Sequence, residues 1–316
     1  MEQQHNGVLN GTLTRQLADL QRQISTIIKG KPAQIRDCVA CLIAGGHLLI
    51  EDLPGVGKTT LAHALAISMG LKFSRLQFTA DLMPSDLVGV SVYEREQAGF
   101  VFHPGPVFAQ VLLADEINRA GPKTQSALLE AMEENQVSID GVSHPLPQPF
   151  FVIATQNPSE QLGTYPLPES QLDRFLMRIS LGYPDALAER ELLAGQDSRE
   201  ALRALQPVMQ AGELLAAQQA VRGVHASAAL LDYLQALIAA TRSGQWFVEG
   251  LSPRAGLAVL RAARALALLQ GRDFVSPDDV QAILPQTIAH RLRPRAGAGR
   301  GSREQVRAMI EAIPLP

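Results

Sequence analysis

The amino-acid sequence predicts an α/β protein in which a parallel sheet with helices on both faces is followed by an all-α domain. In the first part of the chain, apolar strand-like runs alternate with helical patterns, which is typical of a parallel sheet covered on both faces. After Tyr183 and Pro184, strand patterns stop, and Leu, Ala, Gln and Arg recur at helical spacing. A glycine-containing loop between the first strand and the next helix is a third indication, since phosphate-binding α/β folds share this order.

Five apolar runs define the predicted sheet. We expect strands at residues 48–51, 71–78, 111–114, 150–155 and 178–181. Helical patterns precede or separate these runs at residues 32–44, 60–69, 123–135 and 169–175. The alternation predicts parallel strands that are joined by helical crossovers.

Two short hairpins are predicted as insertions in this sheet domain. The first joins residues 90–94 to 100–103, and the second joins 137–139 to 142–144 through Asp140-Gly141. Both residues of that turn tolerate the positive φ that a two-residue hairpin loop requires. A parallel sheet is complete without the hairpins, so we expect projections that suit contact with another molecule. Surface loops without a function are the alternative.

The second half of the chain is predicted to be helical at residues 187–193, 211–221, 226–241, 253–270 and 277–284. Ser252-Pro253 and Ser276-Pro277 mark two helix starts, because Ser is a preferred N-cap and Pro a preferred first helical residue. We therefore divide the chain into a flexible N-terminus (1–13), an α/β domain (14–183) and a helical domain (184–316).

Composition and charge limit the possible function classes. The chain has 28 basic and 31 acidic side chains, which excludes a histone-like or arm-like DNA-binding protein and gives no sign of nucleic-acid binding. The apolar stretches fall short of the ~20 residues that a membrane span needs, and residues 1–11 lack the order of a secretory signal. Two cysteines cannot build a disulfide scaffold. We expect a cytoplasmic protein without a membrane span.

Two features are interpreted as structural. Cys38 and Cys41 share one face of a helical pattern and have no second pair or nearby His, so buried thiols are favoured over a zinc or redox site. A C-terminal basic run is interpreted as a solvated tail, with contact to a polyanion or an acidic partner as the alternative. It comprises Arg291, Arg293, Arg295, Arg300, Arg303 and Arg307.

The loop that begins at Asp52 predicts a phosphate-binding site. Gly55 and Gly57 allow backbone N–H groups to curl around an anion, and the following helix adds its dipole. Lys58 is expected to reach the β- and γ-phosphates of a nucleotide, and the Thr59 hydroxyl to hold Mg²⁺. The general pattern has Gly at the position of Asp52, so a tight glycine turn that caps a buried helix is the alternative.

Two further strands end in polar residues. Strand 111–114 is followed by Asp115 and Glu116. If this strand lies next to the first one, Asp115 reaches the Mg²⁺ on Thr59, and Glu116 can polarise a water as a general base. Asn157 follows the fourth strand and is expected to hydrogen-bond the γ-phosphate or the attacking water, since ligands of open α/β sheets bind at the carboxyl ends of the strands. A carboxylate pair at a strand exit and a turn-forming Asn-Pro are the alternatives.

Five segments of the chain carry a specific resemblance to a known family. They are Glu-Asp-Leu-Pro-Gly-Val-Gly-Lys-Thr (51–59), Gln-Phe-Thr-Ala-Asp-Leu-Met-Pro-Ser-Asp (77–86), Ala-Asp-Glu-Ile-Asn-Arg-Ala (114–120), Thr-Gln-Asn-Pro (155–158) and Leu-Pro-Glu-Ser-Gln-Leu-Asp-Arg-Phe (167–175). With these segments the chain resembles the MoxR family of AAA+ ATPases, in the helix-2-insert clade related to magnesium chelatase motor subunits. The resemblance implies a P-loop AAA+ sheet domain followed by a helical lid, and it identifies the hairpins as the helix-2 insert and the pre-sensor-1 insert.

The resemblance also implies how ATP and Mg²⁺ are held. Lys58 and Thr59 correspond to the Walker A lysine and hydroxyl, and Asp115 and Glu116 correspond to Walker B, with Glu116 as catalytic base. Mg²⁺ ligands are expected from Thr59 and Asp115. Contacts to the nucleotide are expected from Ile28, Gly30, Pro54, Gly55, Val56, Gly57, Lys58, Thr59 and Thr60.

Three further residues correspond to groups that act on the γ-phosphate. Asn157 corresponds to sensor 1, and Arg254 corresponds to sensor 2 on the lid. Arg174 corresponds to the arginine finger, which is donated to the nucleotide of the neighbouring subunit. A surface salt bridge with Asp173 or Glu169 is the alternative for Arg174.

The function implied is that of an ATP-hydrolysing machine. The resemblance implies a homo-oligomeric ring, a hexamer, with a chaperone-like role in maturing or activating other protein complexes. Partners with a von Willebrand factor A domain are typical of the family. A nucleotide-gated binding module that barely turns ATP over is the alternative, and a polynucleotide motor is a weaker one. Glu116 and Arg174 favour hydrolysis, because binding alone needs neither residue.

Overall fold

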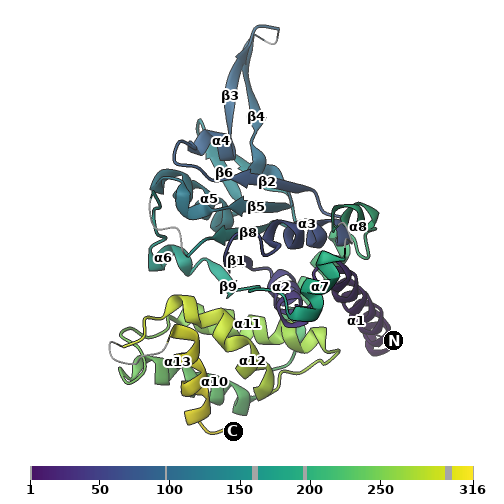
Figure 1. Ribbon diagram of the computed structural model, residues 1–316, viewed down its shortest axis with the longest axis vertical. Coiled ribbons are helices and arrows are strands. Elements are labelled where there is room, and N and C mark those ends of the chain that lie inside the picture. Colours follow the sequence, from purple (N-terminus) through teal and green to yellow (C-terminus); the bar gives the residue numbers. More distant parts are fainter. Residues whose placement is uncertain (1, 97, 159–162, 195–197, 296–300, 316) are drawn as a thin grey trace.

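A five-stranded parallel sheet forms the centre of the computed structural model, which describes residues 2–96, 98–158, 163–194, 198–295 and 301–315. The strand order is β2-β5-β8-β1-β9 (Figure 1). The strands are β1 (His47–Glu51), β2 (Phe73–Gln77), β5 (Val111–Asp115), β8 (Phe151–Gln156) and β9 (Phe175–Ile179). The predicted parallel sheet is confirmed, but β5 is not the neighbour of β1, because β8 pairs with both of them.

Alternate residues of the central strands enter two separate hydrophobic cores. Leu48 and Ile50 of β1 belong to one core, and Leu49 belongs to the core on the opposite face, because successive side chains of a strand point in opposite directions. The residues of β5 divide in the same way. Both faces are covered, which explains why these strands are continuous apolar runs in the sequence.

Helices cover both faces of the sheet. They are α1 (Glu2–Ile27), α2 (Pro32–Ile43), α3 (Lys58–Ser68), α4 (Pro84–Val88), α5 (Pro122–Glu134) and α6 (Glu169–Leu172), with short 3-10 turns η1 (Pro106–Phe108) and η2 (Ile117–Arg119). Buried residues of α2 and α3 join the first core, and those of α4 and α5 join the second. The predicted two-sided cover is therefore confirmed.

Both hairpins form two-stranded antiparallel sheets apart from the central sheet. They pair β3 (Gly89–Glu94) with β4 (Gly99–Pro104), and β6 (Gln136–Ile139) with β7 (Val142–Pro145). Asp140 and Gly141 have φ values of 53° and 79°, as the predicted turn requires. The β3–β4 hairpin projects far from the body of the molecule (Figure 1).

The second half of the chain is helical, as predicted. Its elements are α7 (Ala186–Leu193), α8 (Ser198–Ala204), α9 (Ala211–Gly223), α10 (Ala228–Arg242), α11 (Pro253–Leu269), α12 (Pro277–Ile288), η3 (Ala289–Arg291) and α13 (Ser302–Ala312). Ser252 and Ser276 accept hydrogen bonds from the first turns of α11 and α12 as N-caps. The first hydrophobic core is shared between α2, α3 and this helical part, so the two parts pack directly against each other.

The chain holds more helix than the sequence pattern indicates. Residues 2–13, for which a flexible segment is expected, belong to α1. This helix is anchored by Leu17, Leu20 and Ile24, which are spaced at three and four residues and fully buried. Helices α8 and α13 are additional to those expected.

The segment around Arg174 differs from its prediction. A helix is expected over 169–175, but α6 ends at Leu172. Phe175 is already the first residue of β9, where it pairs with His47 of β1. The fifth strand therefore begins before the expected 178, because Phe175 and Met177 are both fully buried in the sheet.

Candidate functional site

An open cavity of about 330 Å³ lies at the carboxyl ends of β1 and β5. It brings together the predicted phosphate loop and the two predicted acidic residues. Its lining residues are Pro54, Gly55, Gly57, Lys58, Thr59, Thr60, Arg75, Asp115 and Glu116. The side chain of Val56 instead packs against the hydrophobic core, so its backbone is the part that can face a ligand.

The loop before α3 has the backbone geometry of an anion cradle. Gly57 is the N-cap of α3 with a φ of 95°, and Gly55 has a φ of 82°. An L-residue would be strained at both positions. The first residues of α3 line the cavity, so the positive end of the helix dipole lies at the cavity. Lys58 starts this helix, and its Nζ donates a 2.7 Å hydrogen bond to the backbone carbonyl of Asp52.

Asp52 has a structural role that the sequence pattern missed. Its buried carboxylate accepts hydrogen bonds from the backbone N–H of Gly182 at 2.7 Å, from Ser180 Oγ at 3.1 Å and from the Leu53 N–H at 2.9 Å. Ser180 and Gly182 follow β9, the strand next to β1. A glycine at position 52 could not tie the phosphate loop to this segment, so the departure from the general loop pattern adds a constraint here.

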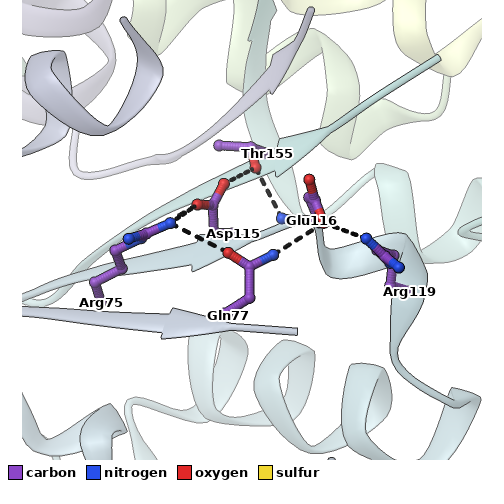
Figure 2. Close-up of polar contacts among 6 residues, drawn as sticks. All are labelled: Arg75, Gln77, Asp115, Glu116, Arg119 and Thr155. Carbon is purple, nitrogen blue, oxygen red and sulfur yellow. Dashed lines mark hydrogen bonds and ion pairs between the residues drawn. The ribbon is translucent and has the colours of Figure 1, made fainter. Parts of the chain in front are cut away.

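Asp115 lies in a polar network at the end of β5 (Figure 2). Its Oδ1 accepts a 2.6 Å hydrogen bond from Thr155 Oγ1 on β8, and its Oδ2 forms a 2.7 Å ion pair with Arg75 on β2. Both neighbouring strands thus hold the carboxylate, which compensates for its burial. Although β8 separates β5 from β1, Asp115 and Thr59 line the same cavity.

Glu116 is held in an uncommon backbone conformation. Its φ is 56°, in the left-handed region, and its N–H donates a 2.8 Å hydrogen bond to Thr155 Oγ1. Its Oε2 accepts from Gln77 Nε2 at 2.9 Å and from Arg119 Nη1 at 3.0 Å (Figure 2). Strained non-glycine residues of this kind cluster at functional sites. The sequence analysis did not identify Arg75, Gln77 and Arg119 as members of the site. Only Gln77 could have been found, because it stands at the carboxyl end of a predicted strand.

Three further predicted site residues, Ile28, Gly30 and Asn157, are not among the residues that line this cavity. Asn157 directly follows β8, the strand between β1 and β5, and is buried. A Cβ at Gly57 would lie 3.9 Å from Ile28 Cδ1, which places Ile28 against the phosphate loop. Gly30 has a φ of 70° and packs against the N-terminus of α7, where a Cβ would meet Asp185 Oδ2 at 3.0 Å.

Arg174 and Arg254 lie together, but away from the phosphate loop of their own chain. Both form ion pairs with Glu133 of α5, at 3.0 Å for Arg174 and 2.9 Å for Arg254. They line a second cavity of about 310 Å³, together with Asp173, Leu176, Leu257, Ala258, Arg261 and Arg291. The alternative pairing of Arg174 with Asp173 or Glu169 is not the one observed, since these carboxylates contact Arg291 and Arg293.

The sequence interpretation of the two cysteines is confirmed, and that of the C-terminal basic run is corrected. Cys38 and Cys41 are fully buried, and burial raises the pKa of both thiols, which disfavours thiolate chemistry. The basic run, however, is not simply a solvated tail. Arg291 is buried against Asp173, and Arg303 donates to the backbone carbonyl of Arg178, because this segment packs beside β9. Arg300 lies outside the described residues.

The described residues show neither a metal-ion cluster nor a membrane-spanning helix. Within them, clusters of three or more His, Cys, Asp or Glu side chains with metal-binding geometry are absent. No helix in the described ranges is both long enough and apolar enough to cross a bilayer.

Comparison with known proteins identifies two family matches and several relatives. The ATPase family associated with various cellular activities (AAA) matches residues 47–177, and the AAA lid domain matches residues 239–313. The chain is 45% identical over 296 residues to the uncharacterized protein YeaC of Bacillus subtilis, covering 93% of this chain and 92% of YeaC. It is 42% identical over 292 residues to the chaperone MoxR1 of Mycobacterium tuberculosis, covering 89% of this chain and 75% of MoxR1.

Structural and more distant similarities agree with these matches. The solved structure of a candidate ATPase from Cytophaga hutchinsonii has a TM-score of 0.91 and 34% sequence identity, and the match covers 100% of this chain and 99% of that one. Subunit ChlI of the chloroplast magnesium chelatase of Nicotiana tabacum is 27% identical over 91% of this chain and 66% of ChlI. With the resemblance of the five segments confirmed at these identities, the chain belongs to the MoxR family of AAA+ ATPases.

Proposed function

We propose that this chain binds ATP with Mg²⁺ and hydrolyses it to ADP and phosphate at the subunit interfaces of a homo-oligomeric ring. The observation that carries the proposal is the single cavity lined by both the phosphate loop and the pair Asp115 and Glu116. A cradle of N–H groups next to a hydroxyl and a carboxylate suits a nucleotide–metal complex. Thr59 and Asp115 supply the hard oxygen donors that Mg²⁺ prefers.

Each residue of this cavity has a distinct proposed task. Lys58 and the loop N–H groups hold the β- and γ-phosphates, while Mg²⁺, when bound, neutralises negative charge on them. Glu116 orients and deprotonates the attacking water, and Asn157 positions that water or the γ-phosphate. The Thr155 hydroxyl donates to the Asp115 carboxylate and accepts from the backbone N–H of Glu116, so it ties the Asp115 side chain to the backbone of Glu116.

The location of the two arginines supports a site that is shared between subunits. Arg174 and Arg254 lie in a cavity of their own and not with the phosphate loop of their chain. We infer that they act on the nucleotide of a neighbouring subunit, where they stabilise the charge of the transition state. Head-to-tail contacts of this kind can close into a ring, and we propose a hexamer.

The biological role that we propose is chaperone-like maturation or activation of partner protein complexes in the cytoplasm. The relative MoxR1 is named a chaperone. The projecting β3–β4 hairpin exposes Val90, Val92, Tyr93 and Phe100, as a contact surface requires. A protein with a von Willebrand factor A domain is the proposed partner class. The near-neutral charge of the chain favours a protein over a nucleic acid.

Phosphate release separates hydrolysis from the alternative of a nucleotide-gated binding module. We expect the wild type to release phosphate from ATP with Mg²⁺ and not in EDTA. Glu116→Gln should retain ATP binding but lose turnover, because the carboxylate acts on water and not on the nucleotide. Wild-type turnover in Glu116→Gln would contradict the catalytic assignment, and tight ATP binding without turnover by the wild type would favour the binding module.

A further inference from the structure

A single carboxylate joins the two arginines that come from different parts of the fold. Glu133 Oε1 lies 2.9 Å from Arg254 Nη2, and Glu133 Oε2 lies 3.0 Å from Arg174 Nη2. Arg174 precedes β9 in the sheet domain, Arg254 stands in the first turn of α11, and Glu133 stands in the last turn of α5. The Glu133 carboxylate is therefore shared between the predicted finger and the predicted lid arginine.

The local helix environments disfavour two of these charges. A carboxylate in the last turn of a helix faces the negative end of the helix dipole, and an arginine in the first turn faces the positive end. Glu133 and Arg254 each stand at the unfavourable end of their own helix. Their mutual ion pair offsets both repulsions, and it lowers the pKa of Glu133, chiefly through the hydrogen bond from Arg254.

The other charged residues around this contact do not substitute for Glu133 as the partner of the two arginines. The cavity that holds Arg174 and Arg254 is also lined by Arg261 and Arg291. Asp173, the acidic residue in the same lining, is bound to Arg291 at 2.9 Å. Among the described residues, Glu133 is thus the carboxylate that offsets the repulsion between Arg174 and Arg254.

We propose that Glu133 is a positioning residue that holds Arg174 and Arg254 as one unit, in the arrangement in which they meet the triphosphate of the neighbouring subunit. The inference rests on the proposed shared site and adds to it a residue of the donating subunit. Each guanidinium meets Glu133 through its Nη2, and a guanidinium has five N–H donors. The arginines can therefore bind phosphate oxygens while Glu133 keeps its place.

The test compares Glu133→Gln with Glu134→Gln. Glu134 is the adjacent exposed carboxylate in the last turn of the same helix, so the second variant makes the same change in charge without touching the arginines. We expect kcat for ATP to fall on the order of ten- to a hundredfold in Glu133→Gln, as for other losses of positioning. Its dissociation constant for ATP should stay within about twofold of the wild-type value, and Glu134→Gln should match the wild type in both quantities.

Two further measurements distinguish positioning from a structural role. In an Arg254→Ala background, Glu133→Gln should lower kcat by a smaller factor than in the wild type, because the two residues act through one contact. Mixed with Glu116→Gln, the Glu133→Gln protein should recover activity, since the defect lies on the donating side of an interface. An unchanged or raised kcat in Glu133→Gln, an equal loss in Glu134→Gln, or no recovery in the mixture would overturn the inference.

The outcomes also separate this inference from the function on which it rests. If the wild type releases no phosphate from ATP, the proposed function fails first. If the wild type is active and Arg174→Ala is impaired, while Glu133→Gln behaves as wild type, the shared site stands and the role of Glu133 is refuted.

Discussion

The carboxylate of Asp52 accepts a 2.7 Å hydrogen bond from the backbone N–H of Gly182. This contact joins the start of the phosphate loop to the segment that follows β9, and Ser180 adds a second hydrogen bond. The nucleotide loop is therefore fixed on one side by a residue from the far end of the sheet domain. A shift of this segment would move the loop, so we expect Asp52 to couple nucleotide binding to the edge of the sheet.

Replacement of Asp52 should weaken both the fold and the site. In Asp52→Ala, the N–H of Gly182 and the hydroxyl of Ser180 lose their acceptor, and buried groups left without one cost about 1–3 kcal/mol. We expect a loss of that size in the free energy of unfolding by urea, together with weaker ATP binding by calorimetry. Asp81→Ala, a change at an exposed carboxylate, is the matched control. Equal stability and equal affinity in Asp52→Ala and the wild type would show that the contact has no such role.

Removal of the Lys58 ammonium should reduce binding as well as turnover. The residue stands at the N-terminus of α3 and lines the cavity, and a charge-assisted hydrogen bond contributes about 1.5–3 kcal/mol. Lys58→Ala should therefore bind ATP about 10- to 100-fold more weakly by calorimetry. Lys72→Ala removes an exposed lysine before β2 and should bind ATP like the wild type. Unaltered affinity in Lys58→Ala would remove the phosphate-loop interpretation.

His47, the first residue of β1, makes stability depend on pH. Its Nδ1 accepts from the Val152 N–H at 3.0 Å, its Nε2 lies 3.2 Å from the Met132 carbonyl, and burial lowers its pKa to about 4. In the unfolded chain the pKa is about 6.5. Between these values the unfolded state takes up a proton that the folded state does not, so the contribution of His47 to stability is present above pH 6.5 and is lost as the pH falls towards 4.

The His47→Asn variant measures this contribution. From pH 7 to pH 5 the wild type should lose on the order of 2 kcal/mol more unfolding free energy than the variant, since only the wild type carries this titration. Urea unfolding at the two pH values checks the difference, because the other titrating groups are common to both proteins. Parallel pH profiles would mean that His47 keeps an ordinary pKa in the fold.

Local patterns predicted most of the sheet and the centre of the site. The runs around Leu48, Leu112 and Val152 are buried on both faces, so their apolar character alone revealed the strands. The phosphate loop could be predicted because the motif requires glycine at positions of positive φ, and Gly55 and Gly57 adopt such values. The strand order could not be predicted from the sequence, since the periodicity of apolar residues does not tell which strand lies beside β1.

The residues that sequence reasoning missed depend on contacts between distant elements. Gln77 and Thr155 reach Glu116 from neighbouring strands, and Asp52 reaches Gly182 across the sheet edge. Glu133 meets Arg254 from a different part of the fold. None of these pairs lies within the reach of a local pattern, because the pairing is created by the packing of the elements.

The central claim is that Glu116 of one subunit and Arg174 of the next complete one site. Arg174→Ala and Glu116→Gln should each bind ATP nearly normally and hydrolyse it poorly. When the two proteins are mixed, some interfaces combine an intact Glu116 with an intact Arg174. Because such an arginine raises the rate of hydrolysis about a thousandfold or more, these interfaces should be easy to detect.

The decisive measurement is therefore the rate of phosphate release in mixtures of Arg174→Ala and Glu116→Gln across a range of ratios, after subunit exchange has been verified by energy transfer between differently labelled subunits. The account predicts activity that rises above that of either protein alone and is greatest at intermediate ratios. Activity that stays at the sum of the two separate proteins at every ratio would contradict it, because an arginine that serves its own chain cannot be supplied by a neighbour.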